Sequence, residues 1–181
     1  MHYPGSAHAV PWHAVARLSL LLPVLLALAA CGGSDRARPT PVHAGGHWND
    51  VRPADPASAN AVLMRAISLV GTPYRYGGNT PQGGFDCSGL VNYVYSDMLD
   101  LRLPRTSRAL SEYQGPRIDP ERLAPADLVF FSTGGQVTHV GIYVGEGRFV
   151  HAPSTGGTVR LDQLDGHYWR DHYSGARRVL P

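Results

Sequence analysis

Apolar residues recur at helical spacing in three stretches of the chain after residue 57. The first begins at Ser58 or Asn60, either of which can cap a helix, and Gly71 can end it. Its apolar positions are Val62, Leu63, Ala66, Ile67 and Val70. The second follows Asp86, and its apolar face comprises Leu90, Val91, Val94, Tyr95 and Met98. A shorter stretch lies between Thr106 and Gly115. The spacing predicts three amphipathic helices.

After Gly115 the pattern changes to short runs of β-branched and aromatic residues, separated by glycine-rich turns. These runs are residues 128–131, 140–144, 148–152 and 158–161. Helices followed by strands predict an α+β domain, with N-terminal helices packed on a C-terminal antiparallel β-sheet. Residues 72–84, rich in Gly, Pro, Asn and Tyr, predict an irregular segment that can approach a ligand closely.

The N-terminus carries an export signal. Residues 18–30 have the length and composition of a secretory apolar segment and are too short to span a bilayer comfortably. Leu28-Ala-Ala-Cys31-Gly32 resembles the lipobox of bacterial lipoproteins, which implies cleavage before a lipid-bearing Cys31; a plain signal peptide with a chance cysteine is the alternative. We therefore expect a signal peptide at 1–30, a flexible tether at 31–57 and one domain at 58–181. The same resemblance implies, from Gly32 after the cysteine, a location at the periplasmic face of the outer membrane.

Composition limits the functions open to this domain. With 181 residues, 43% of them hydrophobic, the chain can bury a core, which excludes a disordered or collagen-like protein. The formal net charge of +2 is too small to indicate a nucleic-acid partner. A lipid-bearing Cys31 could not form a disulfide with Cys87, the other cysteine. Oligomeric state is not readable from the sequence, and a monomer is assumed.

Cys87 is a candidate nucleophile because it falls in the first turn of the second predicted helix. The helix dipole and unpaired amides there favour a thiolate. Asp86 opposes this, so an imidazole is needed as well, and His139 and His151 are the candidates. Two alternatives give these residues no catalytic role. Cys87 could be a buried structural cysteine, or, because all three side chains can bind a metal ion, the three residues could form a zinc site. We expect neither metal nor cofactor.

The spacing of the strands places the two histidines together. If residues 145–147 form a three-residue hairpin loop, Val144 pairs with Arg148, and His139 lies diagonal to His151 on one face. A two-residue loop would turn them to opposite faces. The first geometry predicts His139 as the base and His151 as the residue that orients it, with Val140, Ile142, Val144 and Val150 in the core.

Six segments occur in an order that resembles the NlpC family of bacterial cell-wall cysteine peptidases. They are Gly71-Thr-Pro-Tyr-Arg-Tyr-Gly-Gly78, Phe85-Asp-Cys-Ser-Gly89, Leu103-Pro-Arg-Thr-Ser107, Asp127-Leu-Val-Phe-Phe131, His139-Val-Gly-Ile-Tyr-Val-Gly145 and Phe149-Val-His-Ala152. The resemblance implies a papain-like fold and cleavage between D-glutamate and meso-diaminopimelate in peptidoglycan stem peptides. Ala126 stands where the family usually has glycine, a departure that concerns a turn.

The same resemblance assigns roles to individual residues. Cys87 is the expected nucleophile, His139 the base and His151 the orienting residue, while the hydroxyl of Tyr74 helps to bind the oxyanion. Asp86 and Ser88 are expected to meet polar parts of the stem peptide. Arg75 and Arg105 are candidates for bidentate contacts to its carboxylates. His167 and His172 are expected to be surface or packing residues near Tyr168, Trp169 and Tyr173.

Two other functions stay open. One is a non-catalytic wall-binding lipoprotein, against which the complete set of Cys87, His139 and His151 argues. The other is a thiol acyltransferase or lipid hydrolase on the same fold. That activity predicts an apolar channel at the site, whereas Asp86, Ser88 and Arg105 predict a polar one.

Overall fold

The computed structural model describes residues 48–49, 51–113, 115–154 and 157–180. The predicted signal peptide, Cys31 and the tether up to residue 47 lie outside the described residues. Within the part that is described, none of the helices has both the length and the apolar character needed to cross a bilayer.

Helix α1 (Pro56–Ser68) starts earlier than predicted. Its N-cap is Asp55, whose carboxylate accepts a hydrogen bond from the Ser58 amide at 3.1 Å, and Pro56 occupies the first turn, where its missing N–H costs nothing. The buried stripe is Ala59, Val62, Ala66 and Leu69, of which Val62 and Ala66 belong to the predicted face. Ile67 and Val70 are 38% and 44% exposed.

Helices α2 (Cys87–Leu99) and α3 (Ser107–Ser111) are found where the sequence predicts them. Asp86 caps α2 by accepting from the Gly89 amide at 2.6 Å, and Thr106 caps α3. Cys87 is therefore the first residue of α2, as predicted. Met98 is the one error in the predicted apolar face of α2, because its side chain is 38% exposed.

The main sheet contains six antiparallel strands in the order β3-β8-β4-β5-β6-β7. Their bounds are β3 (Arg117–Ile118), β4 (Leu128–Thr133), β5 (Gln136–Gly145), β6 (Arg148–His151), β7 (Arg160–Gln163) and β8 (Tyr173–Arg177). A second sheet pairs β1 (Asn79–Thr80) with β2 (Gly84–Phe85), and the remaining helices are η2 (Pro120–Arg122) and α4 (His167–His172). The α+β prediction is confirmed, although β3, β8, η2 and α4 were not predicted, and neither was the β1–β2 pair at the segment expected to be irregular.

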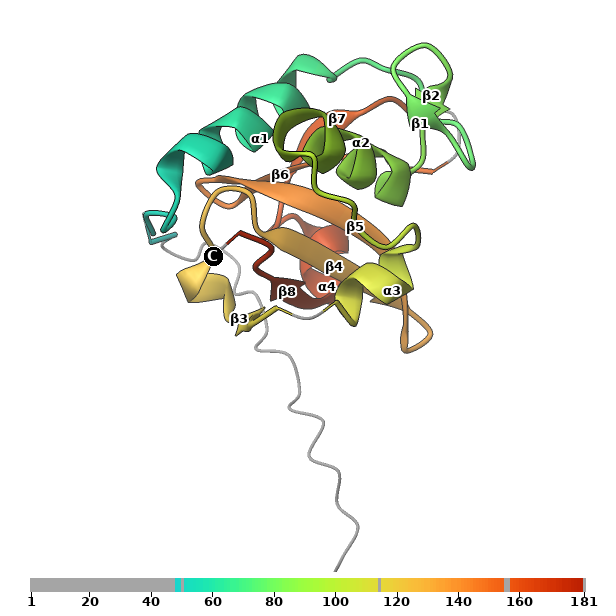
Figure 1. Ribbon diagram of the computed structural model, residues 1–181. Helices are drawn as coiled ribbons and strands as arrows, with labels where there is room; N and C mark the ends of the chain where they lie inside the picture. The colour runs from blue at the N-terminus through green and yellow to red at the C-terminus, as the bar shows by residue number, and fades with distance from the viewer. Residues whose placement is uncertain (1–47, 50, 114, 155–156, 181) are drawn as a thin grey trace, which may run out of the picture. The chain divides into compact units, whose positions relative to one another are not determined.

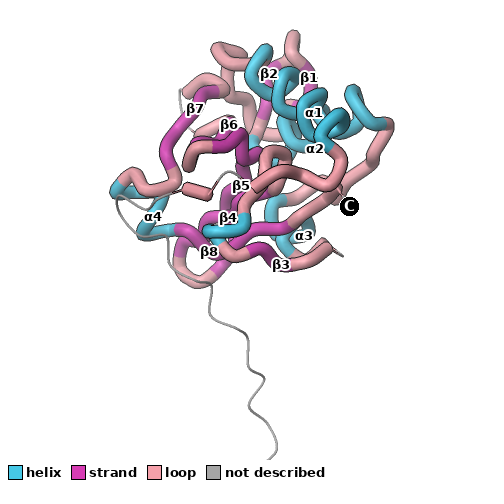
Figure 2. The backbone as a smooth tube through the Cα atoms, turned by 90° about the vertical axis from the view of Figure 1, so that its left-hand side faces the viewer, coloured by secondary structure: helices cyan, strands magenta, loops and turns pink. Residues whose placement is uncertain are grey.

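Each face of the main sheet is covered by its own core. Alternate strand residues face α1 and α2, so Leu128 and Phe130 join the core that contains Leu90. Val129 and Phe131 face the other way and pack with Trp169 of α4. Figure 1 shows α1 and α2 together on one side of the sheet, and Figure 2 shows α4 on the other side.

The β5–β6 hairpin reaches the predicted pairing by a different route. Ile142 pairs with Val150, but Gly145 rather than Val144 pairs with Arg148. The loop is thus a two-residue turn with positive φ at Glu146 (52°) and Gly147 (71°), and Val144 is the extra residue of a β-bulge. Because the bulge adds one residue to β5, the histidines face the same side despite the shorter loop.

The backbone of Ala126 and the contacts of Trp48 are not suggested by the sequence. Ala126, before β4, has a φ of 73°, a region that favours glycine, and its carbonyl accepts from the Tyr95 hydroxyl. Trp48, in the predicted flexible tether, packs against Tyr143 and lies so close to Gly147 that a side chain there would overlap its ring. The end of the tether is therefore part of the folded domain.

Candidate active site

Cys87, His139 and Tyr74 line one cavity of about 580 Å³. Cys87 comes from the start of α2, His139 from β5 and Tyr74 from the irregular segment before β1, so three separate elements supply the site. The backbone amide of Val140, next to His139, acts on the Cys87 thiol and lowers its pKa. Cys87 is a free cysteine. The structure thus brings the predicted nucleophile, base and oxyanion residue to one water-accessible place.

His139 belongs to a chain of hydrogen bonds that fixes its tautomer. Nε2 of His139 lies 2.9 Å from Nδ1 of His151, and Nε2 of His151 lies 3.0 Å from Oδ2 of Asp162. A carboxylate only accepts, so His151 donates from Nε2 and its Nδ1 accepts. His139 must then donate from Nε2. Its Nδ1 keeps the lone pair, which makes Nδ1 the basic atom available to Cys87.

The surroundings of these groups favour their neutral forms. Burial, together with the neighbouring His151, lowers the pKa of His139 to about 3. Burial also raises the pKa of the Cys87 thiol, as does the Asp86 carboxylate, while backbone amides act in the opposite direction. The resting pair is therefore a thiol and a neutral imidazole, and the helix dipole does not by itself produce the thiolate that the sequence suggested.

Asp162 remains ionised although it is partly buried. Burial raises the pKa of its carboxyl, but hydrogen bonds from His151 and Trp169 outweigh this effect and bring the pKa to about 2. Nε1 of Trp169 donates to Oδ2 at 2.8 Å, and Arg160 donates to the same oxygen from Nε and Nη2. Asp162 is thus a permanent acceptor at the end of the chain.

Burial of the neutral histidines predicts loss of stability in acid. The unfolded chain binds a proton on each imidazole below its ordinary pKa of 6.5, whereas folded His139 does not until about pH 3. The free energy of unfolding should therefore fall as the pH drops from 6 to 4, by up to about 1.4 kcal/mol per pH unit for each such group. Urea titrations of wild type and His139→Gln should show a shallower fall in the variant. Equal slopes would contradict this assignment.

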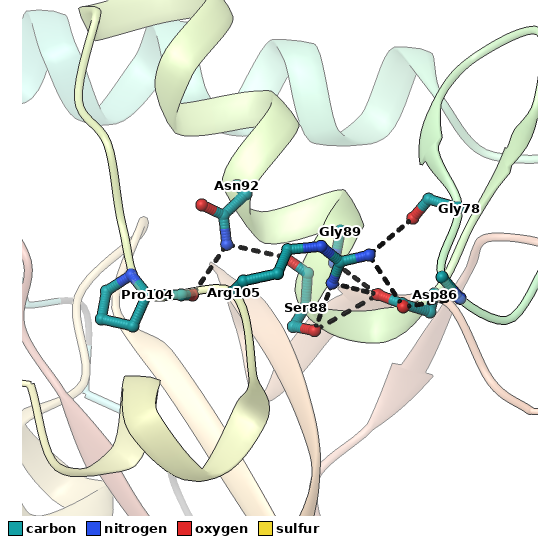
Figure 3. Close-up of polar contacts among 8 residues, drawn as sticks. Gly78, Asp86, Ser88, Gly89, Asn92, Pro104 and Arg105 are labelled. Carbon is teal, nitrogen blue, oxygen red and sulfur yellow. Dashed lines mark hydrogen bonds and ion pairs between the residues drawn. The ribbon is translucent and has the colours of Figure 1, made fainter.

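The start of α2 is held by a network around Arg105 (Figure 3). The guanidinium binds both carboxylate oxygens of Asp86 at 2.9 Å, and Nη1 also donates to Oγ of Ser88 at 2.8 Å. Its Nη2 donates to the Gly78 carbonyl at 3.4 Å. Although burial raises the pKa of the Asp86 carboxyl, the hydrogen bonds from Arg105 and Gly89 lower it overall. The residue before the nucleophile is consequently fixed by an ion pair.

The four residues expected at the substrate do not line the cavity of Cys87. Asp86 and Ser88 contact each other and Arg105, and Ser88 is buried. Arg105 lines a different cavity of about 480 Å³, beside Asn92 on α2. Arg75 is exposed on the segment that carries Tyr74. Their contacts to substrate therefore stay predictions.

Asp162 and Trp169 are the site residues that the sequence analysis missed. Phe149 pairs with Asp162 and His151 with Arg160, so Asp162 is the diagonal neighbour of His151. The rule that joined the two histidines would have found Asp162 if the last predicted strand had been extended by one residue. Trp169 stacks on His139 with ring centroids 5.3 Å apart, although it comes from a segment expected to be surface or packing.

The described residues include no cluster of three or more His, Cys, Asp or Glu arranged to hold a metal ion.

The family model described as the NlpC/P60 family matches residues 71–178, more than half of the chain. The chain belongs to the NlpC/P60 family. Both Cys87 and the His139–His151 pair lie inside the matched region.

Two curated relatives illustrate the range of this NlpC/P60 family. Murein DD-endopeptidase MepH of Escherichia coli is 43% identical over 141 residues, which cover 76% of this chain and 52% of that protein. Gamma-DL-glutamyl hydrolase of Bacillus subtilis is 42% identical over 130 residues, or 69% of this chain and 30% of the hydrolase. This chain therefore spans about half of MepH and less of the hydrolase.

The fold of the NlpC/P60 domain is also shared with solved structures. A crystal structure of an NlpC/P60 family protein from Bacillus cereus superposes with a TM-score of 0.65 at 33% identity. The match covers 72% of this chain and 41% of that one. The papain-like α+β fold expected from the sequence is confirmed.

Proposed function

We propose that the chain is a cysteine endopeptidase that hydrolyses peptidoglycan stem peptides. The observation that carries the proposal is the chain of hydrogen bonds from His139 through His151 to Asp162 beside the Cys87 thiol. Nucleophile, base and orienting group are the parts that covalent hydrolysis of an acyl bond requires. The murein endopeptidase and glutamyl hydrolase activities of the two relatives support this class of substrate.

In the proposed reaction, Nδ1 of His139 takes the thiol proton as the sulfur of Cys87 attacks the scissile carbonyl. The imidazolium then protonates the departing amine, and the C–N bond breaks to leave a thioester on Cys87. Water, deprotonated by His139, hydrolyses the thioester and restores the thiol. Because His151 accepts from His139 and donates to Asp162, the imidazolium is stabilised without moving a proton along the chain.

The Tyr74 hydroxyl and the Cys87 amide are the proposed donors to the oxyanion. Burial raises the pKa of Tyr74, and so do Cys87 and Asp86, so the hydroxyl keeps its proton. The amide of Cys87, at the first position of α2, has no acceptor within the helix.

Tyr74→Phe should lose rate and keep binding. Removal of one oxyanion donor typically costs about 2.7 to 4 kcal/mol in the transition state, or 10² to 10³-fold in kcat. Steady-state kinetics on a purified stem peptide should therefore show a large fall in kcat with little change in KM. Exposed Tyr76→Phe serves as the control, because its side chain is 90% exposed on the same segment. An unchanged kcat in Tyr74→Phe would remove the role.

The bond that we propose joins the γ-carboxyl of D-glutamate to meso-diaminopimelate. The six segments shared with the cysteine peptidases support it, as does the name of the Bacillus subtilis relative. The name of MepH supports a second candidate, the D,D bond of a cross-link. Digestion of purified monomeric and cross-linked muropeptides, followed by mass spectrometry, separates the two. Fragments ending in D-glutamate are expected; cleavage of cross-links alone would assign the D,D bond instead.

The composition of the cavity bears on the acyltransferase or lipid hydrolase alternative. Its lining includes Thr133, Thr138, Ser154 and Arg160 as well as His139. A long acyl chain requires a mostly aliphatic channel, and no Leu, Ile or Val lines this cavity among the described residues. A polar peptide suits it better.

A non-catalytic wall-binding role is disfavoured by the complete hydrogen-bond chain at the thiol.

The location that we propose follows from the N-terminal sequence. Attachment of lipid to Cys31 would hold the domain at a membrane surface, since acyl chains contribute about 0.8 kcal/mol per buried methylene. Gly32 in the lipobox-like segment supports the periplasmic face of the outer membrane. There the domain would meet the stem peptides of its own cell wall.

A further inference from the structure

The cavity of Cys87 continues past His139 to β7 and α4. Besides the catalytic residues it is lined by Arg160 from β7 and by Tyr168, Trp169 and His172 from α4. His139 stacks on Trp169, so α4 lies directly against the base. The base must protonate the departing amine, and the released half of the substrate therefore has to lie on the side of His139. Arg160, Tyr168 and His172 form what we call the α4 end of the cavity.

The α4 end carries the guanidinium of Arg160, and no carboxylate lines it among the described residues. None of the residues described as lining the cavity is Asp or Glu. Arg160 contacts Asp162 through Nε and Nη2, which leaves Nη1 without a partner among the described residues. The side chain of Arg160 is 51% exposed and that of Asp162 only 23% exposed. A substrate therefore meets the guanidinium rather than the anion paired with it.

Aromatic rings next to Arg160 complete the surface. Tyr168 is 56% exposed and stacks on His172 with ring centroids 4.2 Å apart. Nδ1 of His172 lies 2.7 Å from the Tyr168 carbonyl and so donates to it, leaving Nε2 for a ligand. An exposed ring pair provides an apolar face for an aliphatic side chain, and the guanidinium beside it suits a carboxylate at the end of such a chain.

We propose that the α4 end is the subsite for the amino acid released by cleavage, and that Arg160 recognises a free carboxylate at the end of its side chain. The inference rests on the proposed function, because that function supplies a diamino acid with such a carboxylate on the released side. It adds a requirement: a substrate whose side-chain carboxylate is amidated, or is absent as in lysine, is a poor one.

Two tetrapeptides that differ only in this group test the proposal. Both are L-Ala-γ-D-Glu-meso-diaminopimelyl-D-Ala, one with a free and one with an amidated side-chain carboxyl. Wild type should cleave the free form with a kcat/KM at least about tenfold higher, mainly through KM, since a charge-assisted hydrogen bond is lost with the amide. Arg160→Gln should bring the ratio of the two close to one.

The ratio of kcat/KM for the free peptide to kcat/KM for the amidated peptide separates recognition of the carboxylate from an effect on catalysis. Arg160 also donates to Asp162, so Arg160→Gln is expected to slow both peptides by a common factor, and that factor cancels. Arg148→Gln is the matched control, because Arg148 is similarly exposed at 44% but pairs with Glu146 and lies outside this cavity. It should keep the wild-type ratio. A wild-type ratio near one, or an unchanged ratio in Arg160→Gln, would overturn the proposal.

A second measurement needs no variant. The released dipeptide, meso-diaminopimelyl-D-Ala, should inhibit wild type with a Ki at least about tenfold lower than its amidated form. Equal inhibition constants would also overturn the proposal. If wild type cleaves neither tetrapeptide, the proposed function fails and this subsite fails with it, whereas cleavage of both at equal rates removes only the subsite.

Discussion

Replacement of Cys87 by alanine is expected to reduce hydrolysis of stem peptides by about 10⁴ to 10⁶-fold. Without the sulfur no thioester can form, and the His139 chain has no nucleophile to activate. The fold should survive, because alanine keeps the Cβ atom and Asp86 still caps α2. Product release by chromatography, together with a thermal melt, measures both effects.

The control for this substitution is Ser96→Ala on the exposed side of the same helix. It should retain wild-type activity and a similar melting temperature. If Cys87→Ala kept more than a few per cent of the wild-type rate, a covalent mechanism at this cysteine would be ruled out.

Replacement of His151 by leucine should cost about 10² to 10⁴-fold in kcat, the second largest effect that we expect. Leucine cannot accept from Nε2 of His139, so the tautomer that leaves Nδ1 basic is no longer fixed. It also leaves Asp162 without its buried donor. Asparagine has the opposite consequence for His139, because its oxygen lies near the position of Nδ1 of His151 and can accept from Nε2 of His139.

The two variants distinguish loss of the hydrogen bonds at position 151 from a change of packing there. His151→Asn should remain within about tenfold of wild type in kcat, while His151→Leu, which fills the buried site with an apolar side chain, should not. Steady-state kinetics of both proteins on one stem peptide give the comparison. Equal losses in the two variants would show that the hydrogen bonds of position 151 do not orient His139.

Much of the site was predictable because its geometry is local. Asp86 is a strong N-cap residue, which placed Cys87 at a helix start. The two-residue period of strands placed His139 beside His151. The predicted hairpin loop was nevertheless wrong, and the pairing holds only because a bulge at Val144 adds the residue that the shorter turn lacks. Bulges depend on tertiary packing and leave little trace in a single sequence.

The features that could not be predicted depend on contacts between distant segments. Trp169 contacts His139 and Asp162 from α4, which leads into β8, a strand that the hydrophobic pattern did not reveal and that lies between β3 and β4. Arg105 and Asp86 are 19 positions apart, and no periodic rule joins them. Part of the apolar face of α1 was misplaced, because Ala59 and Leu69 face the core where Ile67 and Val70 were expected.

Mass spectrometry of the protein quenched in acid during turnover tests the central claim most directly. The account predicts that a fraction of the wild-type protein carries the acyl half of the stem peptide, and that proteolysis places this added mass on the segment containing Cys87. Cys87→Ala should carry no such mass and release no product. The added mass on another residue, or product release by Cys87→Ala at the wild-type rate, would contradict it.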